Sequence, residues 1–308
     1  MDDQEARPNT STSRARWTRA QWGLVGLIVS LAAGMVGYQL AHYARIDQTA
    51  ALFIGLPTLL AIALTLAPRA GSATGMIMKG LTIALLMSGP VLKEGFICIL
   101  MASPLIYLVG AIVGKSLDAD KRREEEGGTR LYSFILIPLL LASMEGVTPA
   151  LMLPTAMTVQ ADRSVTASPE AVEAKLASTP DFSRPLPAFL QMKFPQPVDG
   201  EGGGLVVGDR RTIHYAGKAA PRELVFVVAE RSPGYVRFHA LSDNTKISEW
   251  LAWQDAEVRW QATPGGSTAI QWTLHFERRL SPGWYFGPLE SYGATEAAGY
   301  LIDSLATP

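Results

Sequence analysis

Two carboxylates that stand in apolar sequence are the first candidates for chemistry. Glu94 and Glu145 are each followed by a glycine and, within ten residues, by a proline. A charge in hydrocarbon costs at least about 2.5 kcal/mol, so such residues either serve a function or lie where water reaches them. One interpretation is a membrane acidic site formed by both carboxylates, for a proton, a cation or a lipid headgroup. The other is that Glu94 is solvated in a loop and Glu145 marks an early end of its helix.

The familiar catalytic and metal-binding patterns are missing from the sequence. It contains no His-Glu-x-x-His, Gly-x-Ser-x-Gly, Walker or dinucleotide-binding pattern. Its single cysteine, Cys98, excludes an internal disulfide and a cysteine zinc cluster. His214, His239 and His275 fall on three different predicted strands and could converge on a metal. His275 is expected on the polar face, however, and no carboxylate–His pair stands out, so we expect no metal site and no cofactor.

The two halves of the chain differ in how their charges are distributed. Residues 1–154 carry 13 Lys/Arg and 11 Asp/Glu in short stretches between long apolar runs. Residues 155–308 carry 14 Lys/Arg and 17 Asp/Glu, spread evenly, which gives this half a net charge of −3 (14 − 17) and no basic stripe. This composition excludes a wholly soluble enzyme and a disordered chain, and argues against nucleic-acid binding.

The first half predicts a bundle of about five transmembrane helices, since a span needs about 20 mostly apolar residues. We expect a tail over 1–21, a transmembrane helical domain over 22–154 and an extracytoplasmic domain over 155–308. The first span is too long for the apolar region of a cleavable signal peptide. The expected spans are Trp22–Ala44, Ala50–Ala67, Thr74–Leu92, Phe96–Gly114 and Leu131–Leu153.

Lys and Arg set the expected orientation of these spans. The tail and the loops on its side carry ten, whereas the loops on the other side carry only Arg45 and Lys93. The sequence therefore predicts a multi-pass protein of the plasma (inner) membrane with a cytoplasmic N-terminus. Because five is odd, the last domain is expected to be periplasmic or extracellular.

From Val159 onward, short alternating runs with turn residues between them predict an antiparallel sheet. Ser168-Pro169-Glu170 predicts a helix start, and Pro185–Met192 a second short helix. Residues 199–204 are expected to be a turn, and both Arg210-Arg211 and Arg278-Arg279 to be solvated strand ends. Residues after Gly283 predict a long helix whose apolar stripe holds Ala297, Tyr300, Leu301 and Leu305.

This order of elements resembles the START-related, birch-pollen-allergen-like superfamily (SRPBCC), often called polyketide cyclase/dehydrase. The resemblance covers about 145 residues. It implies a helix-grip fold, an α+β domain in which a curved antiparallel sheet wraps the C-terminal helix and leaves a cavity for an apolar ligand. The residues that carry it are 165–172, 207–211, Glu257–Trp260, 267–272 and the C-terminal helix.

Alternation along the strands indicates which side chains face that helix. On the last strand the even positions from Ile270 to Phe276 are apolar, and the odd positions from Ala269 to Glu277 are mostly polar. The expected ligand-binding residues are Val258, Trp260, Ile270, Trp272, Leu274, Phe276, Tyr300 and Leu301. For each of them, ordinary core packing is the alternative.

The sequence thus predicts a membrane-anchored, START-like protein that binds or presents a hydrophobic, lipid-like ligand at the outer face of the membrane. Its expected partners are the lipid bilayer and that ligand. Two alternatives stay open. One is an enzyme acting on the ligand through Tyr235, Arg237 or His239, and the other is an assembly or sensing module that binds a protein.

Overall fold

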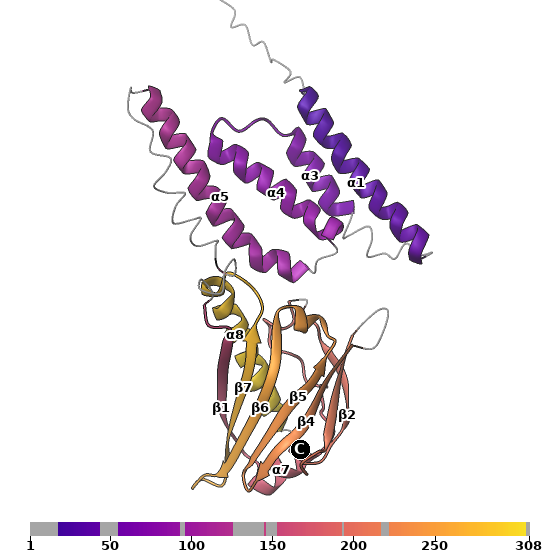
Figure 1. Ribbon diagram of the computed structural model, residues 1–308, viewed down its shortest axis with the longest axis vertical. Coiled ribbons are helices and arrows are strands. Elements are labelled where there is room, and N and C mark those ends of the chain that lie inside the picture. Colours follow the sequence, from indigo (N-terminus) through magenta and orange to yellow (C-terminus); the bar gives the residue numbers. More distant parts are fainter. Residues whose placement is uncertain are drawn as a thin grey trace, which may run out of the picture. The chain divides into compact units, whose positions relative to one another are not determined.

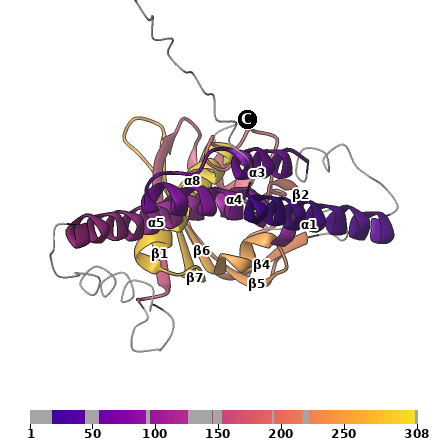
Figure 2. The ribbon, with the colours of Figure 1, turned by 90° about the horizontal axis from the view of Figure 1, so that it is seen from above.

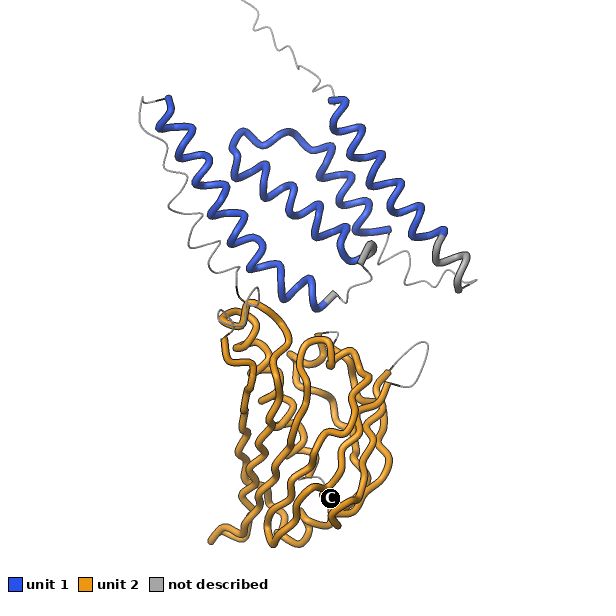
Figure 3. Tube along the Cα trace, viewed as in Figure 1, with its two compact units in different colours: residues 1–136 blue, residues 137–308 orange. Residues whose placement is uncertain are grey.

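A computed structural model of the chain describes residues 18–43, 55–92, 96–125, 145, 153–192, 194–216 and 222–305. The chain divides into two compact units, residues 1–136 and 137–308 (Figure 3). Each unit is described by itself.

The first unit is helical. Its helices α1, α4 and α5 extend in nearly the same direction in two perpendicular views (Figures 1 and 2). Helix α4 packs against α3 and α5, and α1 packs against α3. The helices span Arg19–Tyr43 (α1), Leu56–Leu66 (α3), Ala73–Leu92 (α4) and Phe96–Glu125 (α5).

Side chains form hydrogen bonds with free backbone groups at two helix ends in this unit. Asp118 of α5 accepts hydrogen bonds from the backbone N–H of Ala73 at 2.6 Å and from the Thr74 hydroxyl at 2.6 Å, and so caps the start of α4. Lys79 donates to the Ala67 carbonyl at 2.8 Å, just after the end of α3. Gly114 permits the close approach of α4 and α5, because a Cβ there would lie 2.5 Å from Thr74 Cα.

Two described helices, not five, are long and apolar enough to cross a membrane: α1 over Arg19–Gly37 and α5 over Ile97–Glu125. The apolar helices Leu56–Leu66 and Ala73–Gly89 are shorter. An 11-residue helix such as α3 rises only about 16 Å at 1.5 Å per residue, about half the hydrocarbon thickness. The expected fifth span lies outside the described residues except for Glu145 and Leu153.

The second unit is a seven-stranded antiparallel sheet with the order β1-β7-β6-β5-β4-β3-β2. The long helix α8 packs on β1 and β7 (Figure 1). The predicted curved sheet with a C-terminal helix across it is confirmed. Its elements are β1 Ala156–Val165, α7 Pro169–Ala177, β2 Pro197–Gly202, β3 Arg210–Tyr215, β4 Arg222–Ser232, β5 Tyr235–Asp243, the 3-10 helix η3 Lys246–Glu249, β6 Leu251–Ala262, β7 Thr268–Arg278 and α8 Gly283–Leu305.

Local sequence explains most of these boundaries. The Ser168 hydroxyl accepts from the Ala171 N–H at 3.2 Å and caps α7, as predicted. Gly234 turns β4 into β5 with φ of +70°, which a residue with a Cβ rarely adopts. Its carbonyl accepts from the Trp260 N–H at 2.9 Å, which ties the turn to β6.

Two local predictions are wrong. Residues 199–204 belong largely to the edge strand β2, which pairs with β3. Residues 188–192 form a turn instead of a helix. Pro185 and Pro187 supply no backbone N–H, so few hydrogen bonds are available to extend a helix there.

Candidate functional site

The face of the sheet toward α8 carries the predicted ligand-binding residues. Along β7 every even-numbered residue from Thr268 to Arg278 is buried, and the residues between them are less buried. On β6, Val258 and Trp260 are buried on the same face. The predicted alternation is therefore confirmed, and one hydrophobic cluster joins these strands to β1, α7 and α8.

Seven of the eight predicted ligand-binding residues lie in or beside this cluster. Six of them are core members: Val258, Trp260, Ile270, Trp272, Leu274 and Phe276. Leu301 is partly buried and packs against the cluster. Tyr300 is buried, and its hydroxyl donates to the Arg184 carbonyl at 3.0 Å. That these side chains line a ligand cavity stays a prediction.

An open pocket lies where β1, the β4–β5 turn, β6 and β7 meet. Trp260 and Ile270 of the apolar face are part of its lining, but most of the lining is polar. Asp162, Arg259 and Gln271 are examples, and by the strand alternation they belong to the opposite, charged face. The pocket is therefore an open surface groove and not an enclosed apolar site.

The helix contributes small residues where the sheet contributes large ones. The buried stripe of α8 contains Gly287, Glu290, Ala294, Ala298 and Ile302. Of the predicted stripe, Tyr300 and Leu305 are buried, and Leu301 is partly buried against the cluster, whereas Ala297 is half-buried. The prediction missed the small residues beside them. Because five of the nine buried residues of α8 are glycine or alanine, α8 presents little side-chain volume to the strands β1 and β7 on which it packs.

Three buried polar groups face this apolar layer without partners. The indole N–H groups of Trp253 and Trp272 and both carboxyl oxygens of Glu290 have no hydrogen-bond partner among the described residues. Glu290 is only 6% exposed. Its burial raises the pKa of its carboxyl from 4.5 to about 7, while the Leu280 backbone and the Arg278 charge act in the opposite direction. Sequence reasoning missed Glu290, although its spacing from Gly287 and Ala294 places it on the same helical face.

Arg278 and Glu145 form a buried ion pair beside the start of α8. Arg278 Nη2 lies 2.7 Å from Glu145 Oε1, and the two side chains are 3% and 6% exposed. Arg278 also donates to the Leu280 carbonyl and, at 3.3 Å, to the Leu153 carbonyl. The other Glu145 oxygen accepts from the Gly283 N–H at 2.5 Å. Glu145 is therefore a structural anchor of the second unit.

These contacts correct two expectations. Arg278 is a buried residue, not a solvated strand end, because its side chain points to the same face as Phe276. Glu145 is held by Arg278, and Glu94 lies outside the described residues, so a site formed by both carboxylates stays a prediction.

Arg211 is also buried, contrary to expectation. It donates to the Leu176 carbonyl and, at 3.0 Å, to the Gly204 carbonyl. Its guanidinium lies 4.8 Å from the centre of the Phe238 ring. Burial lowers the pKa of Arg211 to about 10, so it stays charged at neutral pH. Its role is to join α7 and the β2–β3 loop to the sheet.

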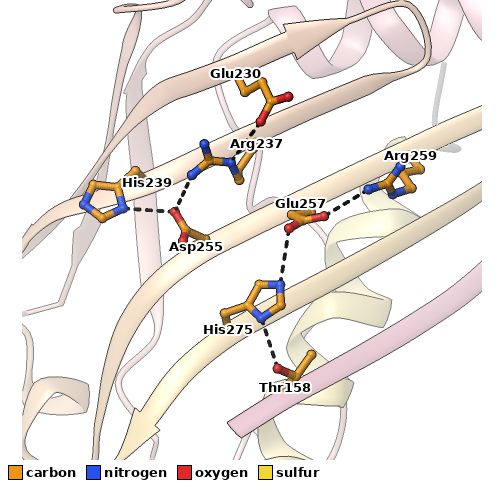
Figure 4. A network of polar contacts seen from close by, with 8 residues as sticks. All are labelled: Thr158, Glu230, Arg237, His239, Asp255, Glu257, Arg259 and His275. Atoms are coloured by element: carbon orange, nitrogen blue, oxygen red, sulfur yellow. Dashed lines mark hydrogen bonds and ion pairs between the residues drawn. The ribbon is translucent and has the colours of Figure 1, made fainter. Parts of the chain in front are cut away.

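The opposite face of the sheet carries a network of charged pairs (Figure 4). His239 Nδ1 lies 2.9 Å from Asp255, which also pairs with Arg237 at 3.3 Å. His275 pairs with Glu257 at 3.4 Å and contacts Thr158. Of the residues proposed for the enzyme alternative, Arg237 and His239 therefore belong to this network, through Asp255 of the neighbouring strand, and not to the apolar layer. The Tyr235 ring lies under the Arg259 guanidinium, 4.5 Å from it. No group of histidine and acidic side chains within the described ranges has the arrangement of a metal site.

Comparison with known proteins gives matches to solved structures only. No protein-family model matches the chain, and no curated protein matches it. The matches lie over the C-terminal half. A START superfamily protein from Mycobacterium smegmatis is 14% identical, covers 48% of this chain and 94% of its own, and has a TM-score of 0.34. Norcoclaurine synthase from Thalictrum flavum, in truncated form, is 15% identical, with 50% and 94% covered and a TM-score of 0.35.

A protein from Thermus thermophilus is 13% identical, covers 49% of this chain and 94% of its own, and has a TM-score of 0.31. The START-related superfamily that the sequence resembles is thus represented among the structural neighbours of this half. These likenesses concern the fold alone. The helix-grip arrangement itself is given by the strand order and by α8 on β1 and β7.

The raised pKa of Glu290 makes stability depend on pH. Between pH 4.5 and about 7 the folded protein holds this proton while the unfolded chain has lost it. Stability from this group is therefore fully present below pH 4.5 and lost as the pH rises through 7, an effect of about 3 kcal/mol at most. Glu290→Gln should flatten this part of the pH profile, measured as the urea midpoint of the second unit by tryptophan fluorescence. Glu230→Gln, on the other face, should leave the profile unchanged, and an equal slope in Glu290→Gln and wild type would refute the assignment.

Breaking the buried ion pair should be costly because it leaves a buried charge alone. Arg278→Leu is expected to lower the free energy of unfolding by about 3–5 kcal/mol. Adding Glu145→Gln should recover at least half of that loss. Arg237→Leu, in the half-exposed network, should cost about 1 kcal/mol or less. Equal decreases in the free energy of unfolding for Arg278→Leu and Arg237→Leu, measured by urea titration, would show that the buried pair is no more important for stability than an exposed one.

Proposed function

We propose that this protein is a membrane-tethered binding protein for a hydrophobic, lipid-like molecule, and that the helix-grip unit holds the molecule between its sheet and α8. The observation that carries the proposal is the set of unpartnered polar groups inside an otherwise apolar layer. Folded proteins seldom bury such groups without a partner. A ligand with an apolar body and a polar group would supply the partner that the chain itself lacks.

The small-residue stripe of α8 supports the same proposal. Ala294 and Ala298 are 3% and 0% exposed and belong to the same hydrophobic cluster as the large side chains of the sheet. An apolar molecule placed there would be stabilised by about 25 cal/mol for each Å² removed from water. Because a bilayer is also apolar, net preference for the protein requires shape fit and the polar contacts.

Membrane tethering is supported by apolar side chains on the surface of the first unit. Leu27, Leu59 and Leu108 are 56%, 66% and 54% exposed. Exposed leucines on several helices are costly in water but suit lipid. A tether of this kind raises the effective concentration of the binding unit near lipid.

We further propose that the binding unit lies at the outer face of the membrane, as the distribution of Lys and Arg predicts.

Ligand binding is tested by native mass spectrometry of the full chain extracted in mild detergent. We expect a bound lipid-sized mass that organic extraction removes. Ala298→Phe should fill the layer and abolish the bound mass, whereas Ala297→Phe, on the half-buried side of α8, should retain it. Circular dichroism checks that both variants fold. Wild-type protein that folds but carries no such molecule, and takes none up from membrane extract, would contradict the proposal.

The side of the membrane is tested with single cysteines in a Cys98→Ser background. Gly265→Cys lies in the exposed β6–β7 turn, where an added Cβ meets nothing within 4 Å. An impermeant maleimide should label it on intact cells, and should label a Ser11→Cys control only after lysis. Labelling of Gly265→Cys only after lysis would place both ends of the chain on the same side and leave an even number of crossings.

A further inference from the structure

Glu290 is the most unusual group in the apolar layer. It stands on the buried stripe of α8, between Gly287 and Ala294, with both oxygens shielded from solvent. Neither oxygen accepts a hydrogen bond of ordinary geometry from the residues that the structure describes. An alanine or leucine here would complete the apolar stripe at lower cost, so core packing alone does not explain a carboxyl group.

The nearby cation does not satisfy Glu290. The Arg278 guanidinium lies close enough to oppose the rise in the Glu290 pKa. Its donors are nevertheless directed to Glu145 and to the carbonyls of Leu280 and Leu153. Within this group of two carboxylates and one guanidinium, Glu290 is the member whose oxygens accept no hydrogen bond of ordinary geometry. Only the Leu280 backbone and the Arg278 charge act on it, and they leave its pKa raised.

A second unpartnered group lies at the same end of the layer. Trp253 is paired in register with Phe276, and their ring centroids are 5.7 Å apart. Leu251, two residues before Trp253 on the same strand, pairs with Arg278. The Trp253 indole N–H is a donor only, whereas an ionised Glu290 is an acceptor only. This end of the layer thus offers one unmet donor and one unmet acceptor.

The chemistry of these two groups selects among apolar ligands. A hydroxyl group both donates and accepts, so it can give a hydrogen bond to Glu290 and receive one from Trp253. A pure hydrocarbon leaves both groups unpaired, and an ammonium group cannot accept from the indole. A carboxylate would bring a third negative charge beside Glu145 and Glu290.

We propose that Glu290, with the Trp253 indole, is the polar anchor of the binding site and selects apolar molecules that carry a hydroxyl group. This inference rests on the proposed function, because it names the class of ligand for the same layer.

The test compares 2-naphthol, naphthalene and 2-naphthoate, which share an aromatic body and differ in the polar group. Binding to full-length, delipidated protein is measured by isothermal titration at pH 8. We expect 2-naphthol to bind at least about tenfold more tightly than naphthalene, the ratio that corresponds to about 1.4 kcal/mol. We expect 2-naphthoate to bind more weakly than naphthalene.

Two variants locate the preference. Glu290→Leu should bind 2-naphthol and naphthalene with equal affinity, and Glu290→Gln, whose amide still accepts a hydrogen bond, should keep part of the preference. Glu230→Leu changes an exposed carboxylate on the other face of the sheet and should behave as wild type. Thermal melts establish that each variant is folded before it is titrated.

The outcomes separate this inference from the proposed function. Equal wild-type affinity for 2-naphthol and naphthalene would overturn the role of Glu290 and leave an apolar site that water alone completes. An undiminished preference in folded Glu290→Leu would overturn it as well. Failure of both neutral probes to bind, in a protein that also carries no lipid, would overturn the proposed function together with the anchor.

Discussion

The second unit depends on one constraint, the separation of its sheet into an apolar face and a charged face. Successive side chains of a strand point to opposite faces of the sheet, so a shift of one residue in the strand register would exchange the two faces. On β7 this rule buries Ile270, Trp272, Leu274 and Phe276 and leaves His275 with Glu257 on the other side. The long helix α8 then covers the apolar face, and the charged face stabilises itself through pairs between strands.

The same constraint identifies the buried polar residues that depart from it. Arg278 continues the buried positions of β7, and the fold accommodates it with the Glu145 carboxylate from a segment far away in sequence. Glu290 breaks the apolar stripe of α8, and within the described chain the Leu280 backbone and the Arg278 charge offset its burial only in part, without a hydrogen bond of ordinary geometry. A buried group left unpaired in an otherwise well-packed fold is expected where the structure serves binding in addition to stability.

Much of this architecture follows from the sequence, and the exceptions have identifiable causes. Alternation predicted the inner face of β6 and β7, and Ser168 predicted the start of α7. The edge strand β2 was missed because its Asp199, Gly200 and Gly202 are typical of turns, whereas pairing with β3 overrides that preference. Arg278 was misplaced because its charge was given more weight than its even position on the strand. Glu290 was missed although its helical spacing places it on the buried face. The partner of Glu145 could not be predicted, because a long-range ion pair leaves no local pattern.

Hydrogen exchange of the full chain in detergent, with and without saturating pyrene, tests the central claim most directly. If the layer between the sheet and α8 holds apolar molecules, pyrene should slow exchange in β6, β7 and the buried stripe of α8 from Glu290 to Ile302. Exchange in the edge strand β2 should stay the same. Unchanged exchange throughout the second unit would contradict the account.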